Sequence, residues 1–167
     1  PNQLVMTSGA VSALGLALRS IFESEQRRCN CTGTPAVIVP APYYFSYDKL
    51  VVGSLGGAIV PAQFTMGTGI EYTPGSDGEE SESLSWDRFA DPDTSMLSNS
   101  GGVEPFVAAL ERAYDRTQVV DSDLRPSVLL LTHPHSPLGR VYSDAQLLAA
   151  ATFAAARGLH IVVDEIF

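Results

Sequence analysis

The sequence has little lysine, few positive charges and no long apolar run. Only one of its ten basic residues is a lysine, Lys49, against 19 acidic residues, and the formal net charge is −9. A chain this acidic is disfavoured as a partner of nucleic acid or of anionic membrane surfaces. No stretch of about 18 apolar residues is present, so no membrane span is expected. The first residues also lack the charged-then-apolar pattern of a signal peptide.

Cysteine and metal-binding patterns are equally sparse. Cys29 and Cys31 are the only cysteines, and they are too few and too close together for a disulfide framework. No histidine and cysteine pattern completes a zinc site, and His133 and His135 stand in a proline-rich turn with no third ligand near them in the sequence. We therefore predict no metal site. So little cysteine is typical of a cytoplasmic protein.

The apolar pattern predicts an α/β fold. With 167 residues, 45% hydrophobic and 17% charged, the chain is long and apolar enough for one domain with a sizeable core. Short apolar strands are expected at 1–6, 36–40, 58–64, 126–132 and 159–164, and amphipathic helices at 10–27, 104–116 and 144–157, with a helical segment near Tyr47. Strands that alternate with helices indicate three α/β/α layers around a mostly parallel sheet with right-handed crossovers.

Helix-end signals and one polar segment complete this outline. Thr7 or Ser8 is expected to cap the first helix. Ser143 and Gln146 form a capping-box pattern, and Gly158 is a helix stop. Residues 67 to about 102 are rich in Ser, Gly, Asp and Glu, and their few apolar residues follow no period. We interpret them as an acidic excursion or mobile loop with a solvated surface.

Unusual segments stand where the carboxyl ends of the strands should meet. In parallel α/β sheets the ligand binds at that edge. The segments are "TSGA" (7–10), "PAPYY" (40–44), "THPHSPLG" (132–139) and "DEIF" (164–167). Their convergence predicts a binding site, although each one alone has an ordinary structural explanation.

Each segment suits one kind of contact. The helix start would leave the amides of Gly9, Ala10 and Val11 free to bind a phosphate, or it is an ordinary helix start. The tyrosine pair can stack on a flat ligand or fill the core. The carboxylates of Asp164 and Glu165 can pair with a protonated ring nitrogen, hold a metal, or be common strand-end acids. A magnesium-dependent nucleotide module is disfavoured because no G-x-x-x-x-G-K-[ST] loop is present.

Taken in order, these segments resemble the fold-type I pyridoxal-phosphate enzymes. The resemblance is to the aminotransferase class I/II family, in its branch similar to 1-aminocyclopropane-1-carboxylate synthase. That family has "T-x-G-A", then "P-x-P-Y-Y", then "N-P-x-N-P-L-G", then "D-E-I-Y". Here they stand as "TSGA", "PAPYY", "HPHSPLG" and "DEIF". The match covers nearly the whole chain apart from the acidic excursion, and it implies part of the large domain of such an enzyme.

The resemblance also implies a cofactor, pyridoxal 5'-phosphate, and positions that bind it. The amides at the helix start would hold the phosphate, the proline turn would reach the phenolic oxygen, and a carboxylate would keep the ring nitrogen protonated, so that the ring accepts electrons from a bond at the substrate α-carbon. The positions carried over are Gly9, Ala10, Val11, Tyr44 (stacking on the ring), Ser136 (phenolic oxygen) and Asp164 (ring nitrogen).

The chain departs from the family pattern at several of these positions. His133 and Ser136 stand for the two asparagines of the proline turn, Phe167 stands for the tyrosine of "DEIY", and Val11 stands for a usual threonine. Phe167 has no hydroxyl to donate to the phenolic oxygen. These changes favour a divergent member, with altered chemistry or with none.

The resemblance further implies that the chain is part of a longer polypeptide. The family's Schiff-base lysine follows the "DEIY" strand, and Lys49, at a helix start away from the strand ends, is no substitute. We therefore expect no catalytic residue in residues 1–167, and an N-terminal arm, a small domain and the lysine segment elsewhere. Two hypotheses remain: a homodimeric aminotransferase or 1-aminocyclopropane-1-carboxylate synthase-like lyase of amino-acid biosynthesis, or a catalytically inactive scaffold paralogue.

Overall fold

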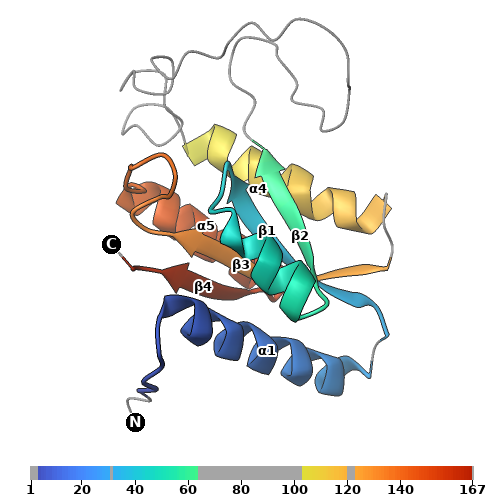
Figure 1. Cartoon of the computed structure of the whole chain (residues 1–167). Helices are drawn as coiled ribbons and strands as arrows, with labels where there is room; N and C mark the ends of the chain where they lie inside the picture. The colour runs from blue at the N-terminus through green and yellow to red at the C-terminus, as the bar shows by residue number, and fades with distance from the viewer. Residues whose placement is uncertain (1–3, 31, 64–102, 120–122, 167) are drawn as a thin grey trace, which may run out of the picture.

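The computed structural model describes residues 4–30, 32–63, 103–119 and 123–166, which fold around one parallel sheet (Figure 1). The strand order is β2-β1-β3-β4, and all three pairings are parallel. The strands are β1 (Thr34–Ala41), β2 (Ala58–Gln63), β3 (Leu124–Thr132) and β4 (His160–Asp164); the helices are α1 (Ala10–Cys29), α2 (Ser46–Asp48), the π-helix η1 (Lys49–Ser54), α4 (Val103–Val119) and α5 (Asp144–Arg157).

Helices cover both faces of the sheet, which confirms the three-layer α/β/α prediction. On one face, Leu18 of α1 and Val51 of η1 pack against Val39 and Leu130. On the other face, α4 and α5 pack against residues that include Ile38 of β1. Successive strand side chains point to opposite faces, and both faces are buried, so the central strands are continuous apolar runs rather than alternating ones.

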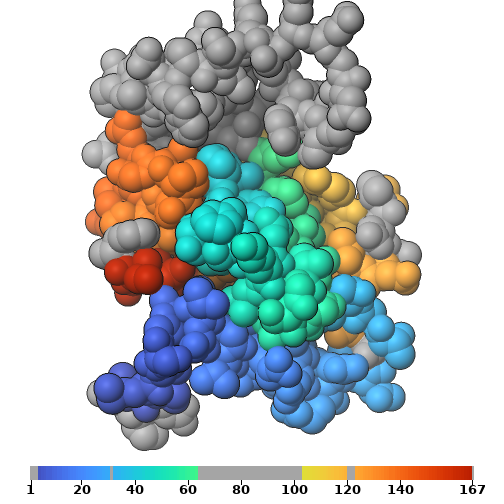
Figure 2. All heavy atoms as spheres, viewed as in Figure 1, coloured from blue at the N-terminus to red at the C-terminus, as the bar shows by residue number. Residues whose placement is uncertain are grey.

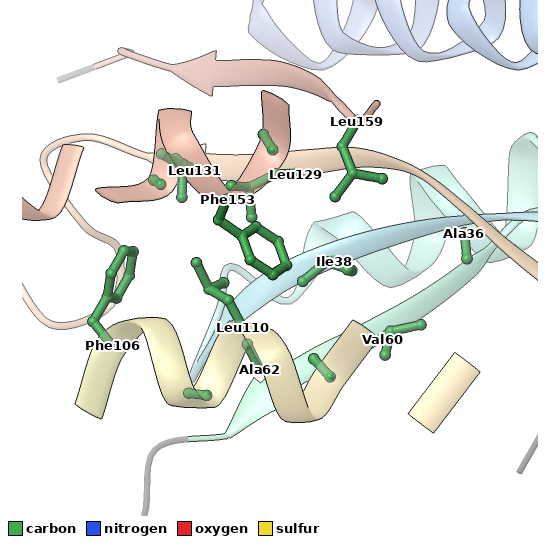
Figure 3. Close-up of a cluster of buried hydrophobic side chains, with 14 of the residues drawn as sticks. Ala36, Ile38, Val60, Ala62, Phe106, Leu110, Leu129, Leu131, Phe153 and Leu159 are labelled. Carbon is green, nitrogen blue, oxygen red and sulfur yellow. The ribbon is translucent and has the colours of Figure 1, made fainter. Parts of the chain in front are cut away.

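The larger of the two cores lies between the sheet and the pair α4 and α5 (Figure 3). Phe106 and Leu110 of α4 and Phe153 of α5 meet Leu129 and Leu131 of β3 there. Burying side chains of this size stabilises the fold by about 1.5–3 kcal/mol each. This core anchors β3, and so it fixes where the turn that follows β3 begins.

The ends of α5 follow the local sequence chemistry. Ser143 and Gln146 form the expected capping box, and Gly158 ends the helix with a φ of 65°, in the left-handed region that favours glycine. The predicted side-chain cap of α1 is wrong. Its N-cap residue is Gly9, which has no side chain to accept from the first helix amides, and the Thr7 hydroxyl donates to the Gly9 carbonyl.

One predicted strand is also wrong. Residues 4–6 form no strand and are exposed, since no neighbouring strand pairs with them in the described ranges. The other strands and helices are confirmed, with ends that differ from the predictions by at most a few residues. The acidic excursion at about 67–102 and Phe167 lie outside the described residues. Among the helices that the structure describes, none is long and apolar enough to cross a membrane.

Candidate functional site

A pocket of about 110 Å³ lies at the carboxyl edge of the sheet. Its walls come from the start of α1, the turn after β1 with α2 and η1, the ends of β3 and β4, and the proline turn. Figure 2 shows this face, where the start of α1 (dark blue), the segment after β1 (cyan) and the end of β4 (red) adjoin. Five of the six predicted positions line the pocket: Ala10, Val11, Tyr44, Ser136 and Asp164.

Gly9 is the sixth predicted position, and it lies next to the pocket rather than in its lining. Its φ is 154°, which L side chains rarely adopt, so glycine suits this N-cap. The first α1 hydrogen bond runs from the Ala13 amide to the Gly9 carbonyl at 3.0 Å. The amides of Ala10 and Val11 therefore precede that bond, as helix geometry requires, and the positive end of the helix lies at the pocket.

Strand register explains why Asp164 is at this edge. Thr132 and Asp164 are paired positions in the parallel ladder of β3 and β4. One residue further on, the His133 amide donates to the Asp164 carbonyl oxygen at 2.9 Å. The start of the proline turn is thereby tied to the end of β4, and Ser136 and Asp164 reach the same pocket.

Tyr44 presents an aromatic ring to the pocket while other rings support it. Its side chain is 36% exposed. Phe45 meets the ring edge-on at a centroid distance of 4.9 Å, and Tyr47 does so at 5.7 Å. These edge contacts restrict the orientation of the Tyr44 ring, as aromatic pairs prefer such contacts. The exposed part of the ring remains available to a flat ligand.

Tyr47 is the polar centre of the pocket floor. It is 1% exposed, its hydroxyl donates to Asp164 Oδ2 at 2.8 Å, and it lies 2.7 Å from Thr132 Oγ1. Burial, reinforced by the Asp164 carboxylate, raises the pKa of the Tyr47 phenol. The phenol is therefore protonated, and a donor, throughout the physiological pH range.

The two histidines of the proline turn support it from outside the pocket lining. The Tyr142 amide donates to His133 Nδ1 at 3.4 Å, and the two rings stack at 5.9 Å. His135 is 3% exposed, and burial lowers its pKa to about 4. Its Nδ1 has no hydrogen-bond partner within the described part of the chain. No group of three potential metal ligands occurs among the residues that the structure describes.

Three polar residues that line this pocket were not among the predicted positions: Ser46, Tyr47 and Thr132. Tyr47 follows Tyr44 by three residues, and the Tyr47 amide donates to the Tyr44 carbonyl at 3.0 Å, so the turn before α2 brings the two side chains together. The i, i+3 spacing of the two tyrosines is the signal in the sequence. Thr132 is the last residue of an apolar strand, and a polar residue at that point belongs to the ligand-binding edge of a parallel sheet.

Comparison with known proteins agrees on one family. The family model for aminotransferase class I and II matches residues 82–167. A curated relative, 1-aminocyclopropane-1-carboxylate synthase of Malus domestica, is 27% identical over 169 residues, which cover 100% of this chain and 26% of that protein. The chain therefore spans about a quarter of the length of this curated relative.

Solved structures show the same fold. Aspartate aminotransferase from Thermus thermophilus with maleate superposes with a TM-score of 0.58 at 21% identity, over 96% of this chain and 29% of that one. A PLP-bound C-S lyase from Staphylococcus hominis gives 0.57 at 12% identity, over 98% of this chain and 31% of that one. At these identities the superpositions establish the arrangement of helices and strands.

Proposed function

Because this chain belongs to the aminotransferase class I and II family, we propose that its pocket binds pyridoxal 5'-phosphate within an enzyme that acts on an amino acid. The observation that carries the proposal is one pocket lined by a helix N-terminus, an exposed tyrosine ring, a serine and a carboxylate. A flat, phosphorylated, protonatable ring is the ligand whose groups match that set. A solved structure with the same fold is a PLP-bound lyase, which adds support.

Each wall of the pocket has a proposed partner on the cofactor. The amides at Gly9, Ala10 and Val11 hold the phosphate at the positive end of α1. Tyr44 stacks on the ring. Asp164 accepts a hydrogen bond from the protonated ring nitrogen.

Ser136 completes the proposed set of contacts. Its hydroxyl, on the proline turn, donates to the phenolic oxygen directly or through a water. When bound, the cofactor supplies an electron sink for the bond broken at the substrate α-carbon. The residues of this chain contribute binding and orientation and hold a proton on the ring nitrogen.

The rest of the active site is proposed to lie outside this chain. Lys49 belongs to η1, and its ammonium lies 5.7 Å from the centroid of the Phe45 ring, so it has a structural contact of its own. We assign no catalytic residue to residues 1–167. The lysine that carries the cofactor, the small domain and the N-terminal arm belong to a longer, cytoplasmic, homodimeric polypeptide in this proposal.

The reaction is proposed to be that of an aminotransferase or of a 1-aminocyclopropane-1-carboxylate synthase-like lyase. The similarity of the whole chain to such a synthase favours the second. A catalytically inactive scaffold is the alternative, and Ser136 and Phe167 favour it, because they stand where the resemblance places an asparagine and a tyrosine that donate to the phenolic oxygen. The aminotransferase, the lyase and the inactive scaffold would share this fold, so only an assay of the products formed distinguishes them.

The test uses the full-length protein that contains this chain. Titration with pyridoxal 5'-phosphate should produce a saturable change of absorbance, and absence of binding would refute the proposal. The loaded protein is then given amino acids with a leaving group on the γ-carbon, or amino-acid and 2-oxo-acid pairs. Formation of 1-aminocyclopropane-1-carboxylate identifies the lyase, amino-group transfer identifies the aminotransferase, and binding without either product identifies the scaffold.

A further inference from the structure

A buried tyrosine hydroxyl joins the ends of two neighbouring strands beneath the pocket. Tyr47 Oη lies 2.7 Å from Thr132 Oγ1 at the end of β3 and 2.8 Å from Asp164 Oδ2 at the end of β4. Thr132 and Asp164 are paired in the strand register, so the hydroxyl bridges two side chains that stand next to each other. Tyr47 itself comes from α2, which lies outside the sheet.

The direction of both hydrogen bonds follows from the number of protons. A phenol has one proton, and an ionised carboxylate only accepts. Tyr47 therefore donates its proton to Asp164, as the geometry already indicates. The Thr132 hydroxyl must then donate to the Tyr47 oxygen. This order, from Thr132 through Tyr47 to Asp164, uses every available proton and leaves no donor facing a donor.

The hydrogen bond from Tyr47 restrains the Asp164 side chain, whose strand is supported by only one neighbouring strand in the described part of the chain. β4 is an edge strand in the described sheet, paired with β3 only. The Tyr47 hydroxyl occupies Oδ2 of Asp164, which leaves Oδ1 as the oxygen available to a ligand in the pocket. A residue that hydrogen-bonds to the second oxygen of a binding carboxylate fixes its orientation, and such supporting contacts tune the affinity of a site.

We propose that Tyr47 is the positioning residue of this pocket: it fixes the Asp164 carboxylate, with support from Thr132, so that one oxygen meets the protonated ring nitrogen of the cofactor. The inference rests on the proposed function, because it takes pyridoxal 5'-phosphate as the ligand. It goes beyond that proposal in giving a binding role to two residues that carry none of the cofactor contacts described above. Tyr47 acts through Asp164 and also supports the ring of Tyr44.

The first test removes one oxygen atom. In the full-length protein, Tyr47→Phe should weaken binding of pyridoxal 5'-phosphate about tenfold, the effect expected from loss of a hydrogen bond to a charged group. Tyr43→Phe is the matched control, since Tyr43 donates to the Asp48 carboxylate at 3.1 Å and does not line the pocket. It should leave the affinity within about twofold. Circular dichroism of both variants establishes that the fold is kept.

A double-mutant cycle separates positioning from general support. If Tyr47 acts through Asp164, Tyr47→Phe changes the affinity less than about twofold when Asp164 is already alanine. Equal losses in the wild-type and Asp164→Ala backgrounds would overturn the inference while the proposed function stands. A wild-type protein that binds no cofactor would overturn both.

Thr132 provides an independent check. Thr132→Val removes the donor and keeps the shape, so it should weaken cofactor binding severalfold, by about the value of one neutral hydrogen bond. Thr132→Ser keeps the hydroxyl and should restore affinity. A serine variant as weak as the valine variant would contradict the relay, because packing of the methyl group would then be the cause.

Discussion

The ring of Tyr44, which lines the pocket, meets the ring of Tyr47 edge-on, with the ring centroids 5.7 Å apart. Tyr44 therefore rests on the residue that also holds Asp164. One helical turn thus supports the side chain proposed to stack on the cofactor and the side chain proposed to hold its nitrogen. The pocket depends on this turn as much as on the sheet.

The first prediction concerns stacking by Tyr44. Tyr44→Phe should leave the affinity for pyridoxal 5'-phosphate within about twofold, because the ring remains. Tyr44→Ala should weaken it about tenfold, since the stacking contribution of about 0.5–1.5 kcal/mol and the ring's apolar contact are both lost. Equilibrium titration followed by absorbance measures both. Equal losses in the two variants would point to the hydroxyl and against stacking.

The second prediction compares two cofactor contacts. Asp164→Asn removes the charge and keeps the shape, and it should weaken cofactor binding about 100-fold, as expected for a charge-assisted pair worth up to about 3 kcal/mol. Ser136→Ala should cost only about fivefold, the value of one neutral hydrogen bond. The same titration compares the two. Small and equal losses of affinity in the two variants would contradict the roles proposed for Asp164 and Ser136.

The third prediction is a pH dependence caused by His135. Burial lowers its pKa to about 4 from the ordinary 6.5. As the pH falls below about 6.5, the unfolded chain therefore takes up a proton that the folded chain does not, and stability is lost. The free energy of unfolding should fall by about 1.5 kcal/mol between pH 6.5 and 5 from this residue.

Urea unfolding at several pH values measures this effect. His135→Gln cannot take up a proton at this position, so its stability should vary less over that interval. Thr152→Ala is the control, because Thr152 carries no titratable group and its side chain makes only an exposed bond to the Leu148 carbonyl. It should keep the wild-type slope. An unchanged slope in His135→Gln would contradict the assignment.

The fourth prediction tests the start of α5. Ser143 Oγ accepts a hydrogen bond from the backbone amide of Gln146 at 3.3 Å. In return, Gln146 Oε1 accepts one from the backbone amide of Ser143 at 2.9 Å. Ser143→Ala should lower the free energy of unfolding by about 1 kcal/mol. Thr152→Ala, in the same helix, removes only an exposed bond to the Leu148 carbonyl and should be nearly neutral. Thermal unfolding monitored by circular dichroism compares them.

Local chemistry explains which parts of this fold the sequence predicts well. The box of Ser143 and Gln146 and the stop at Gly158 depend on neighbouring residues alone, and both are confirmed. The apolar runs of β1 and β3 are long enough to be buried on both faces, and their places are confirmed. The convergence at the pocket was predictable because parallel strands all end at one edge.

The remaining features depend on contacts between distant segments. The hydrogen bond from Tyr47 to Asp164 joins residues 117 positions apart, and its geometry is set by the turn that follows β1. Residues 4–6 are apolar enough for a strand, yet strand formation requires a partner that no local pattern reveals. The missing side-chain cap of α1 has a local cause instead, because the N-cap position is occupied by Gly9, which has no side chain.

The position of β4 has a practical consequence for work with this segment. In the described sheet, β4 pairs with β3 alone, and Ile161 and Val163 on it are 40% and 41% exposed. An uncovered edge with apolar side chains recruits further extended chains. Residues 1–167 expressed by themselves should therefore form concentration-dependent aggregates. The substitution Ile161→Lys should keep them monomeric for spectroscopy.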